Sequence, residues 1–331
     1  MAREPHDSQG AGSCTPNSEV LFVAQKKRRH HYVWQHYLAA WATDGQVWCL
    51  REGRRFSTNT INIAQRRDFY RLKEMTARDL EYVDRLIIQP SAPHLQKIAK
   101  GWIPHFTELF EIRRTYESGD LNLPEFESAL DTSINNLEED MHADIEIRGL
   151  PILVALRNGD ASILDDPQQF VHFCWFVSTQ YMRTPKLKAR AVASMSSIRD
   201  FDVDASWGLI RTIFSANIGA SLNDRRATLR IEFLDAWPDT EFITADQPLV
   251  NTCAVGLPDN VGPDKLEYYY PLSPRLAVLL DFDHESPGTG RRSLTPDEVA
   301  DYNQMLIDEA VEQIYAANEA ILMDSGNHET D

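Results

Sequence analysis

Five polar residues from three distant parts of the sequence could together carry out acid–base chemistry on an anion. His31 and Gln35 lie near the start of the chain, Gln180 and Arg183 near its middle, and Asp246 in its last third. An imidazole titrates near neutral pH and suits proton transfer, whereas a guanidinium offers a planar fork to phosphate or carboxylate. We predict a catalytic set in which His31 moves a proton, Arg183 stabilises the charge on phosphorus and Asp246 orients the imidazole.

The predicted substrate-binding groups are Gln35 and Gln180 from this set and, in addition, Arg275. The catalytic residues also have structural interpretations, which the sequence leaves open. His31 could equally form a hydrogen bond inside the fold, and Arg183 could equally form a buried ion pair with Asp246. For His30 and His36 the structural interpretation is favoured.

Several standard signatures are absent from the sequence. We find no glycine-rich phosphate loop, nucleophile elbow, zinc-ligand helix or dinucleotide fingerprint, so we name no cofactor and predict no metal ligands. The segment from Pro124 to about Asp144 is acidic, and we interpret it as the solvated face of a helix rather than a metal site. The four cysteines are widely scattered, which favours a reducing cytoplasm over a disulfide scaffold.

Composition and charge narrow the class of protein. The chain has 331 residues, of which 43% are hydrophobic, and a net charge of −17, as in a soluble globular protein with a substantial core. No apolar run is long enough to cross a bilayer, and residues 1–18 lack the order of a signal peptide. The acidic body disfavours a broad nucleic-acid surface. The basic run Lys26–Arg29 could still admit RNA or a small anionic ligand, or be only a solvated arm.

The elements that must position these residues follow from apolar spacing and from turn residues. The predicted helices are Tyr32–Trp41, Pro93–Lys100, Ile103–Arg114, Pro124 to about Asp144, Gln168–Met182, Ser206 to about Leu222, and one from the capping box Thr295–Glu298 to Ile314. The predicted strands are Gln46–Leu50 and Arg55–Thr58, which form a hairpin, then Thr228–Phe233, Glu241–Thr244, Glu267–Tyr270 and Leu276–Phe282.

This order of elements predicts an α+β fold. We expect a predominantly helical middle packed on a mainly antiparallel sheet, with an N-terminal helix and a β-hairpin. Residues 1–24 are predicted to be a disordered lead, 25–323 a single domain and 324–331 a C-terminal tail. Two lobes, at about 25–225 and 226–323, are the alternative.

An ordered set of motifs gives this sequence a family resemblance. The motifs are His30-His31-Tyr32-Val33-x-Gln35-x-Tyr37-Leu38, Asp68-Phe69-Tyr70, Gln180-Tyr181-Met182-Arg183-Thr184-Pro185, Ile243-Thr244-Ala245-Asp246-Gln247-Pro248 and Tyr270-Pro271-Leu272-Ser273-Pro274-Arg275. Together they resemble the bacterial domain-of-unknown-function family 4238, over roughly residues 29–323. Trp34 departs from the proline usual in that family. The resemblance supports the architecture and brings no settled activity.

The leading hypothesis is a cytoplasmic bacterial enzyme that hydrolyses a phosphodiester in RNA or a nucleotide, as a toxin-like or defence effector. The alternative is a sensor module that binds an anion or nucleotide without catalysis. A third interpretation is a buried polar network that only holds helix to sheet. Substrate, oligomeric state and partner proteins do not follow from these patterns.

Overall fold

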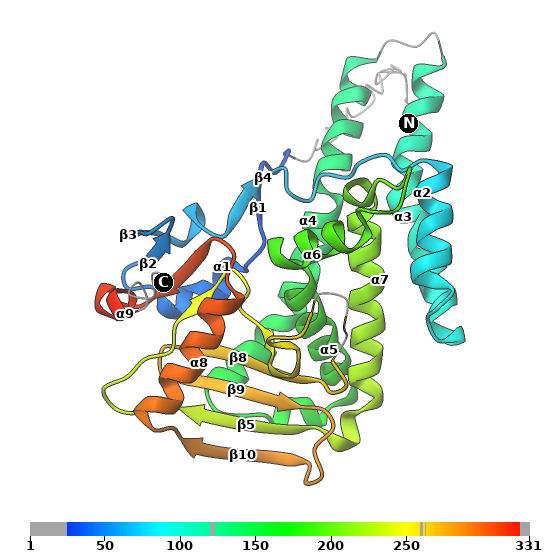
Figure 1. Ribbon diagram of the computed structural model, residues 1–331. Helices are drawn as coiled ribbons and strands as arrows, with labels where there is room; N and C mark the ends of the chain where they lie inside the picture. The colour runs from blue at the N-terminus through cyan, green and yellow to red at the C-terminus, as the bar shows by residue number, and fades with distance from the viewer. Residues whose placement is uncertain (1–24, 120–122, 259–260, 262, 325–331) are drawn as a thin grey trace, which may run out of the picture.

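The computed structural model describes residues 25–119, 123–258, 261 and 263–324. The predicted lead, 1–24, lies outside the described residues, as does the predicted tail apart from Asp324. Helices and mainly antiparallel sheets pack together in an α+β fold, as predicted (Figure 1).

The helices and strands have the following bounds. The helices are α1 (Gln35–Leu38), α2 (Ala77–Val83), α3 (Pro93–Glu117), α4 (Pro124–Arg157), α5 (Pro167–Met182), α6 (Pro185–Met195), α7 (Val203–Asp224), α8 (Pro296–Glu309) and α9 (Glu319–Asp324). The strands are β1 (Arg29–His31), β2 (Gln46–Arg51), β3 (Arg54–Asn59), β4 (Gln65–Arg67), β5 (Arg230–Asp235), β6 (Thr244–Ala245), β7 (Val250–Asn251), β8 (Glu267–Ser273), β9 (Leu276–Asp281), β10 (Gly288–Ser293) and β11 (Gln313–Ala316).

The strands form three sheets. The largest has the order β10-β5-β9-β8-β7 and is antiparallel except where β10 pairs with β5. A second sheet has the order β3-β2-β11-β6, so it joins the predicted N-terminal hairpin to strands from the last third of the chain. The third is the short antiparallel pair β1-β4, which positions the histidines.

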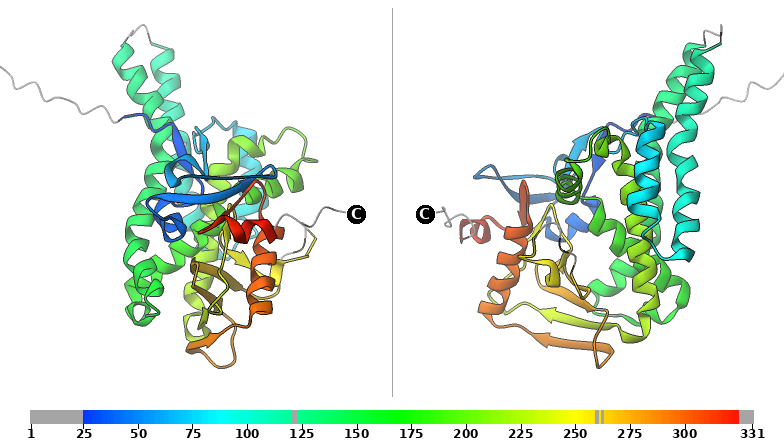
Figure 2. Two further views of the ribbon diagram at one scale, coloured as in Figure 1. Left: turned by 90° about the vertical axis from the view of Figure 1, so that its left-hand side faces the viewer. Right: turned by 45° about the vertical axis from the view of Figure 1, so that its right-hand side comes forward.

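Helix α5 lies at the centre of the molecule, as its apolar sequence predicts. The carboxylate of Asp166 caps the helix by accepting hydrogen bonds from the backbone N–H groups of Gln168 and Gln169, at 2.8 and 2.9 Å. The helix packs against α4, α7 and the large sheet. Figure 2 shows that α3 and α4 run side by side and project together beyond the rest of the molecule.

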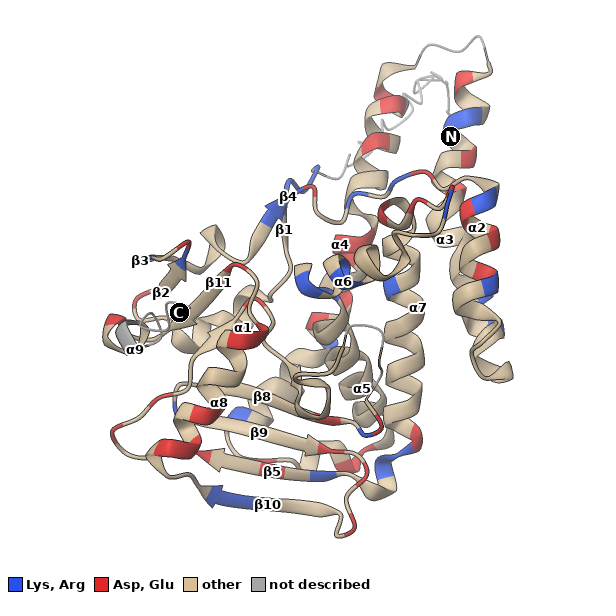
Figure 3. Ribbon diagram, in the orientation of Figure 1, with Lys and Arg blue, Asp and Glu red and all other residues tan. Residues whose placement is uncertain are grey.

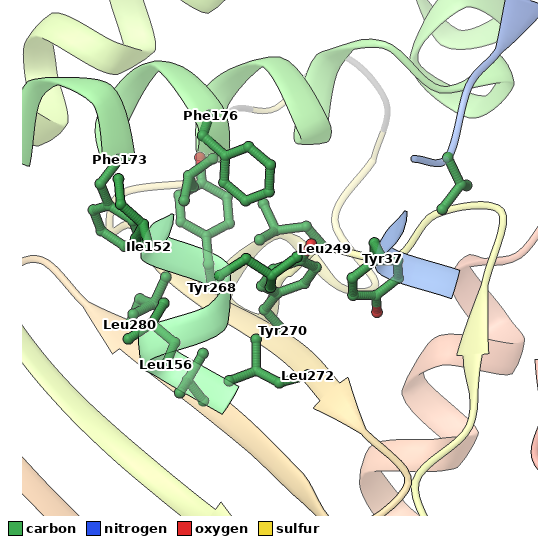
Figure 4. Close-up of a cluster of buried hydrophobic side chains, with 14 of the residues drawn as sticks. Tyr37, Ile152, Leu156, Phe173, Phe176, Leu249, Tyr268, Tyr270, Leu272 and Leu280 are labelled. Carbon is green, nitrogen blue, oxygen red and sulfur yellow. The ribbon is translucent and has the colours of Figure 1, made fainter. Parts of the chain in front are cut away.

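The largest apolar cluster fills the space between α5 and the large sheet (Figure 4). Phe173 and Phe176 of α5 lie over Tyr268 and Tyr270 of β8. A Cβ atom at Gly149 would lie 2.5 Å from the ring of Phe176, so glycine allows α4 to approach α5 closely. Burial of an apolar side chain of this size contributes about 1.5–3 kcal/mol.

Helix α8 covers the opposite side of the large sheet. Val299 and Leu306 are buried among residues of β8 and β9, and the ring of Tyr302 stacks on that of Tyr269 at 4.4 Å between centroids. The sequence predicted this packing and the capping box at Thr295, which is formed. None of the helices in the described part of the chain is both long and apolar enough to span a bilayer.

Two predicted helix boundaries are wrong because tertiary contacts override the local pattern. The helix predicted over Tyr32–Trp41 begins only at Gln35 as α1, because the chain before it is extended as β1. The helix that begins behind Thr295 ends at Glu309, and Ile314 lies in β11, where it pairs with Leu50 and Ala245. Pairing with two strands outweighs the helical spacing of Ile314.

Between residues 93 and 157 the helices predicted from the sequence are shorter than those in the structure. The two helices predicted over 93–100 and 103–114 are one continuous helix, because Ala99, Phe106 and Phe110 bury a single stripe across Gly101. Helix α4 continues beyond the predicted end to Arg157. Helix α6 and strand β10 were not predicted.

Candidate functional site

Strand β1 brings His30 and His31 to the middle of the molecule, with their side chains on opposite faces. The Nδ1 atom of His30 accepts the backbone N–H of Tyr70 at 2.8 Å, and its Nε2 lies 2.9 Å from the carbonyl of Lys27. The ring also stacks on Tyr70. Burial lowers the pKa of His30, although the Lys27 carbonyl opposes that shift. His30 therefore has the structural role that was favoured for it.

Helix α4 presents a polar stripe to β1 and the end of α5. The stripe consists of residues that recur about once per helical turn, with two adjacent glutamates at the second turn. They are Asn135, Glu138, Glu139, His142 and Glu146. Three of these residues are buried and the two glutamates at 139 and 146 are half-buried. The prediction of a solvated acidic face is wrong here. The clue in the sequence is the recurrence of polar residues at intervals of three and four, from Asn135 to Glu146.

Arg183, at the C-terminus of α5, is held between this stripe and β1. One terminal nitrogen donates to Glu146 at 2.5 Å and the other donates to the carbonyl of His31. The predicted alternative of an ion pair with Asp246 is wrong, because the partner is Glu146. Burial opposes the charge on Arg183, but the carboxylate of Glu146 outweighs it and raises the pKa. The guanidinium is therefore permanently charged.

Glu139 lies beside this ion pair and near the backbone N–H of His31. Its Oε2 atom is buried and has no hydrogen-bond partner among the described residues. Burial raises the pKa of Glu139 to about 7, with the nearby charge of Glu146 adding to the shift and that of Arg183 opposing it. A carboxyl group that titrates near neutral pH can both donate and accept a proton.

The imidazole of His31 is half-buried, with its Nε2 atom 3.4 Å from the carbonyl of Ile61. Burial lowers its pKa, the Ile61 carbonyl opposes the shift, and the charge of Arg183 lowers it further. The imidazole is therefore neutral at pH 7. We call His31, Glu139, Glu146 and Arg183 the β1–α4 cluster. The fold brings Arg183 to the backbone carbonyl of His31, and it adds two carboxyl groups that the prediction missed.

Asp246 does not orient His31. The side chain of Asp246 is buried, and its carboxylate accepts the backbone N–H groups of Val311, Glu312 and Gln313 at 2.9, 2.6 and 3.1 Å. These bonds close the turn between α8 and β11. Burial raises the pKa of Asp246, and the three backbone donors oppose that shift. The predicted orienting role is replaced by a structural one.

The three predicted substrate-binding residues lie apart from one another. Gln35 donates to the hydroxyl of Thr60 at 3.3 Å. Gln180 is buried, one turn before Arg183, and neither polar atom of its side chain has a partner among the described residues. Arg275 donates to the backbone carbonyls of Ala236, Trp237, Pro238 and Thr240, and so holds the loop after β5.

The basic run before β1 is paired with acids. Figure 3 shows Lys and Arg in blue at the start of β1 and Asp and Glu in red along the upper part of α4. Lys26 pairs with Asp131, Lys27 with Asp140 at 2.6 Å, and Arg28 with Asp68 at 3.0 Å. Burial opposes the charge on Asp131, but its bonds to Lys26 and Arg71 lower its pKa to about 2. The predicted solvated arm is therefore docked along α4, and these cations are compensated.

The comparisons with known proteins concern the family and not the activity. Residues 29–320 match the family described as "Protein of unknown function (DUF4238)", so the chain belongs to that family. No curated protein and no solved structure matches the chain.

Within the described ranges, no group of three or more His, Cys, Asp or Glu residues is arranged to hold a metal ion.

Proposed function

We propose that the β1–α4 cluster hydrolyses a phosphodiester bond, in RNA or a nucleotide, by acid–base catalysis. One observation carries the proposal: Glu139, whose pKa is raised by burial to about 7, lies close to the backbone of His31, whose pKa is lowered by burial. Groups with pKa values shifted toward the working pH gather at sites of proton transfer. Glu139 also keeps one buried oxygen without a partner among the described residues.

The catalytic roles of His31 and Glu139 follow from these protonation states. Neutral His31 removes a proton from the attacking water, and protonated Glu139 delivers one to the leaving oxygen as the P–O bond breaks. Water is thereby added across the bond, which yields a phosphomonoester and an alcohol. The fixed charge of Arg183 stabilises the negative charge that develops on the phosphoryl oxygens.

The experiment is a pH–rate profile for cleavage of bis(4-nitrophenyl) phosphate and of an end-labelled RNA oligonucleotide. We expect a bell-shaped profile, since the rate falls below the pKa of His31 and above the value of about 7 for Glu139. His31→Ala and Glu139→Gln should each lose about 100-fold or more in rate. His94→Ala, at an exposed position of α3, is the control and should keep the wild-type rate.

Absence of cleavage by the wild type, or equal rates for the two variants and the control, would overturn the catalytic proposal. The effector role is tested separately by expression in a bacterial host. We expect the wild type to arrest growth and His31→Ala to relieve the arrest at equal protein level. Normal growth during expression of the wild type contradicts the effector role. The proposed hydrolysis is then tested only by the rate measurements.

Binding of a small anion without turnover is the second candidate. Gln180 favours it, because a buried amide with no partner among the described residues leaves its donors and acceptors available to a ligand. A thermal-shift screen with nucleotides distinguishes the two candidates. Stabilisation of the protein by a nucleotide that it does not cleave supports binding alone.

A further inference from the structure

A cavity of about 310 Å³ lies on the other side of Tyr70 from the β1–α4 cluster. Its floor is the buried ion pair between Arg211 of α7 and Glu138 of α4. The guanidinium of Arg211 lies over the ring of Tyr70, at 4.5 Å from the centroid. The hydroxyl of Tyr70 points the other way and donates to the carbonyl of Arg183 at 3.2 Å. The cavity and the cluster are thus separate sites that share one wall.

Two residues that line this cavity, Arg211 and Trp207, each have a buried N–H donor without an acceptor among the described residues. Arg211 and Trp207 are only 2% and 3% exposed, and neither the Nε atom of Arg211 nor the Nε1 atom of Trp207 has a partner among the described residues. A buried donor without an acceptor costs about 1–3 kcal/mol. The Oδ1 atom of Asp68, another lining residue, is also buried without a partner among the described residues, so these groups suit a ligand that supplies acceptors as well as a donor.

The mouth of the cavity is rich in cations that an anion could recruit. Lys73 and Lys188 both pair with the carboxylate of Asp204, which lies 2.6 Å from the Lys188 nitrogen. Arg71 pairs at 2.5 Å with Asp131, a residue that does not line the cavity. Four cations and three carboxylates line the cavity, namely Arg71, Lys73, Lys188 and Arg211 against Asp68, Glu138 and Asp204. With Asp131 beside the lining, the cations and carboxylates are equal in number, in a chain whose net charge is −17.

Aromatic side chains form the remaining walls. Phe69 and Phe106 line the cavity together with Trp207, and the ammonium group of Lys188 lies 5.4 Å from the ring centroid of Phe69. Aromatic faces suit the stacking of a nucleobase, and Lys and Arg side chains suit its phosphate. The volume falls within the range of pockets that hold small ligands.

We propose that this cavity binds a nucleoside monophosphate. The phosphate oxygens accept from the buried N–H groups of Arg211 and Trp207 and from the ammonium groups of Lys73 and Lys188, and the base lies against the phenylalanine rings. The proposal does not depend on the proposed hydrolysis, because no residue of the β1–α4 cluster lines the cavity.

Isothermal titration of the full chain with AMP, inorganic phosphate and adenosine tests this proposal. We expect AMP to bind most tightly, phosphate more weakly and adenosine weakest. Lys188→Ala should weaken AMP binding about tenfold, the loss of one hydrogen bond to a charged group. Lys186→Ala is the matched control: it lies on the same helix, is similarly buried, pairs with Glu309 and does not line the cavity, so its affinity should be unchanged.

A second variant predicts a change in the opposite direction. Asp204→Asn removes the carboxylate that competes for both lysines, so AMP binding should become several-fold tighter. Asp200→Asn, at an exposed position outside the cavity, should have no effect. A merely structural role for Asp204 would not raise the affinity.

Three outcomes would overturn the proposal. They are no binding of AMP by the wild type, AMP affinity that neither Lys188→Ala nor Asp204→Asn changes, and binding of phosphate or adenosine as tight as that of AMP. His31→Ala should keep the wild-type affinity for AMP. Loss of cleavage and loss of binding are therefore separate results.

Discussion

Glu139 is an acidic residue on a helix, which is common, but its side chain is largely shielded from solvent, which is unusual. Acidic residues on helix surfaces are frequent, so Glu139 and Glu146 do not stand out in the sequence. His31 and Arg183 were predictable because each belongs to a distinctive motif of polar and aromatic residues. The burial that shifts the pKa of Glu139 depends on β1 and α5, which are far away in the chain, and local spacing does not report it.

The raised pKa of Glu139 has a consequence for stability. Between its ordinary pKa of 4.5 and its value of about 7 in the folded protein, the folded state binds a proton that the unfolded state does not. The free energy of unfolding therefore falls as the pH rises through this range. Above it, Glu139 is ionised in both states and no longer changes the free energy of unfolding. Glu139→Gln removes this dependence. We expect the variant to be more stable than wild type at pH 8 by roughly 1–3 kcal/mol and equally stable near pH 4.

Urea denaturation at the two pH values measures the difference. Glu108→Gln, at an exposed position of α3, controls for the loss of a charge and should match the wild type at both. A Glu139→Gln variant that loses stability at pH 8 would show that the carboxylate is needed in its charged form.

At the scale of elements, the sequence predicted caps that act locally and missed those that act at long range. Asp166 and Thr295 cap helices through residues two or three positions away, and the capping box at Thr295 is evident in the sequence. Asp246 instead closes the turn before β11 through backbone groups 65 to 67 positions further along the chain. Arg275 holds its loop through carbonyls 35 to 39 positions earlier. A polar residue with such a role resembles a catalytic one until the fold is known.

Asp246→Ala is therefore expected to destabilise the protein rather than only silence it. The substitution leaves the N–H groups of Val311, Glu312 and Gln313 without their acceptor, and we expect a loss of roughly 2–4 kcal/mol in the free energy of unfolding. Thermal and urea denaturation measure the loss. Asp301→Ala, on the exposed side of α8, should change stability by less than about 0.5 kcal/mol. Wild-type stability of Asp246→Ala would restore the catalytic interpretation of this residue.

At the scale of the molecule, distant parts of the chain complete one another's structure. Strand β11 pairs with β2 over all four of its residues, and the ring of Tyr37 stacks on that of Tyr270 at 4.9 Å. Arg157, at the end of α4, donates to the carbonyls of Tyr37 and Leu272 at 2.7 and 2.9 Å. The sequence predicted the fold class from local patterns. It left open whether the chain forms one domain or two lobes, because that depends on these pairings between distant segments.

These contacts predict that residues 25–225 do not fold without the rest of the chain. In that fragment β2 loses its pairing with β11, and α5 loses the sheet that covers Phe173 and Phe176, so an apolar face meets water. We expect the full chain to unfold in one transition, with circular dichroism of the backbone and of the aromatic side chains changing together. The fragment should show no cooperative thermal transition. Two separated transitions in the full chain, or a cooperative transition in the fragment, would favour two lobes, because only a unit with its own closed core can unfold independently.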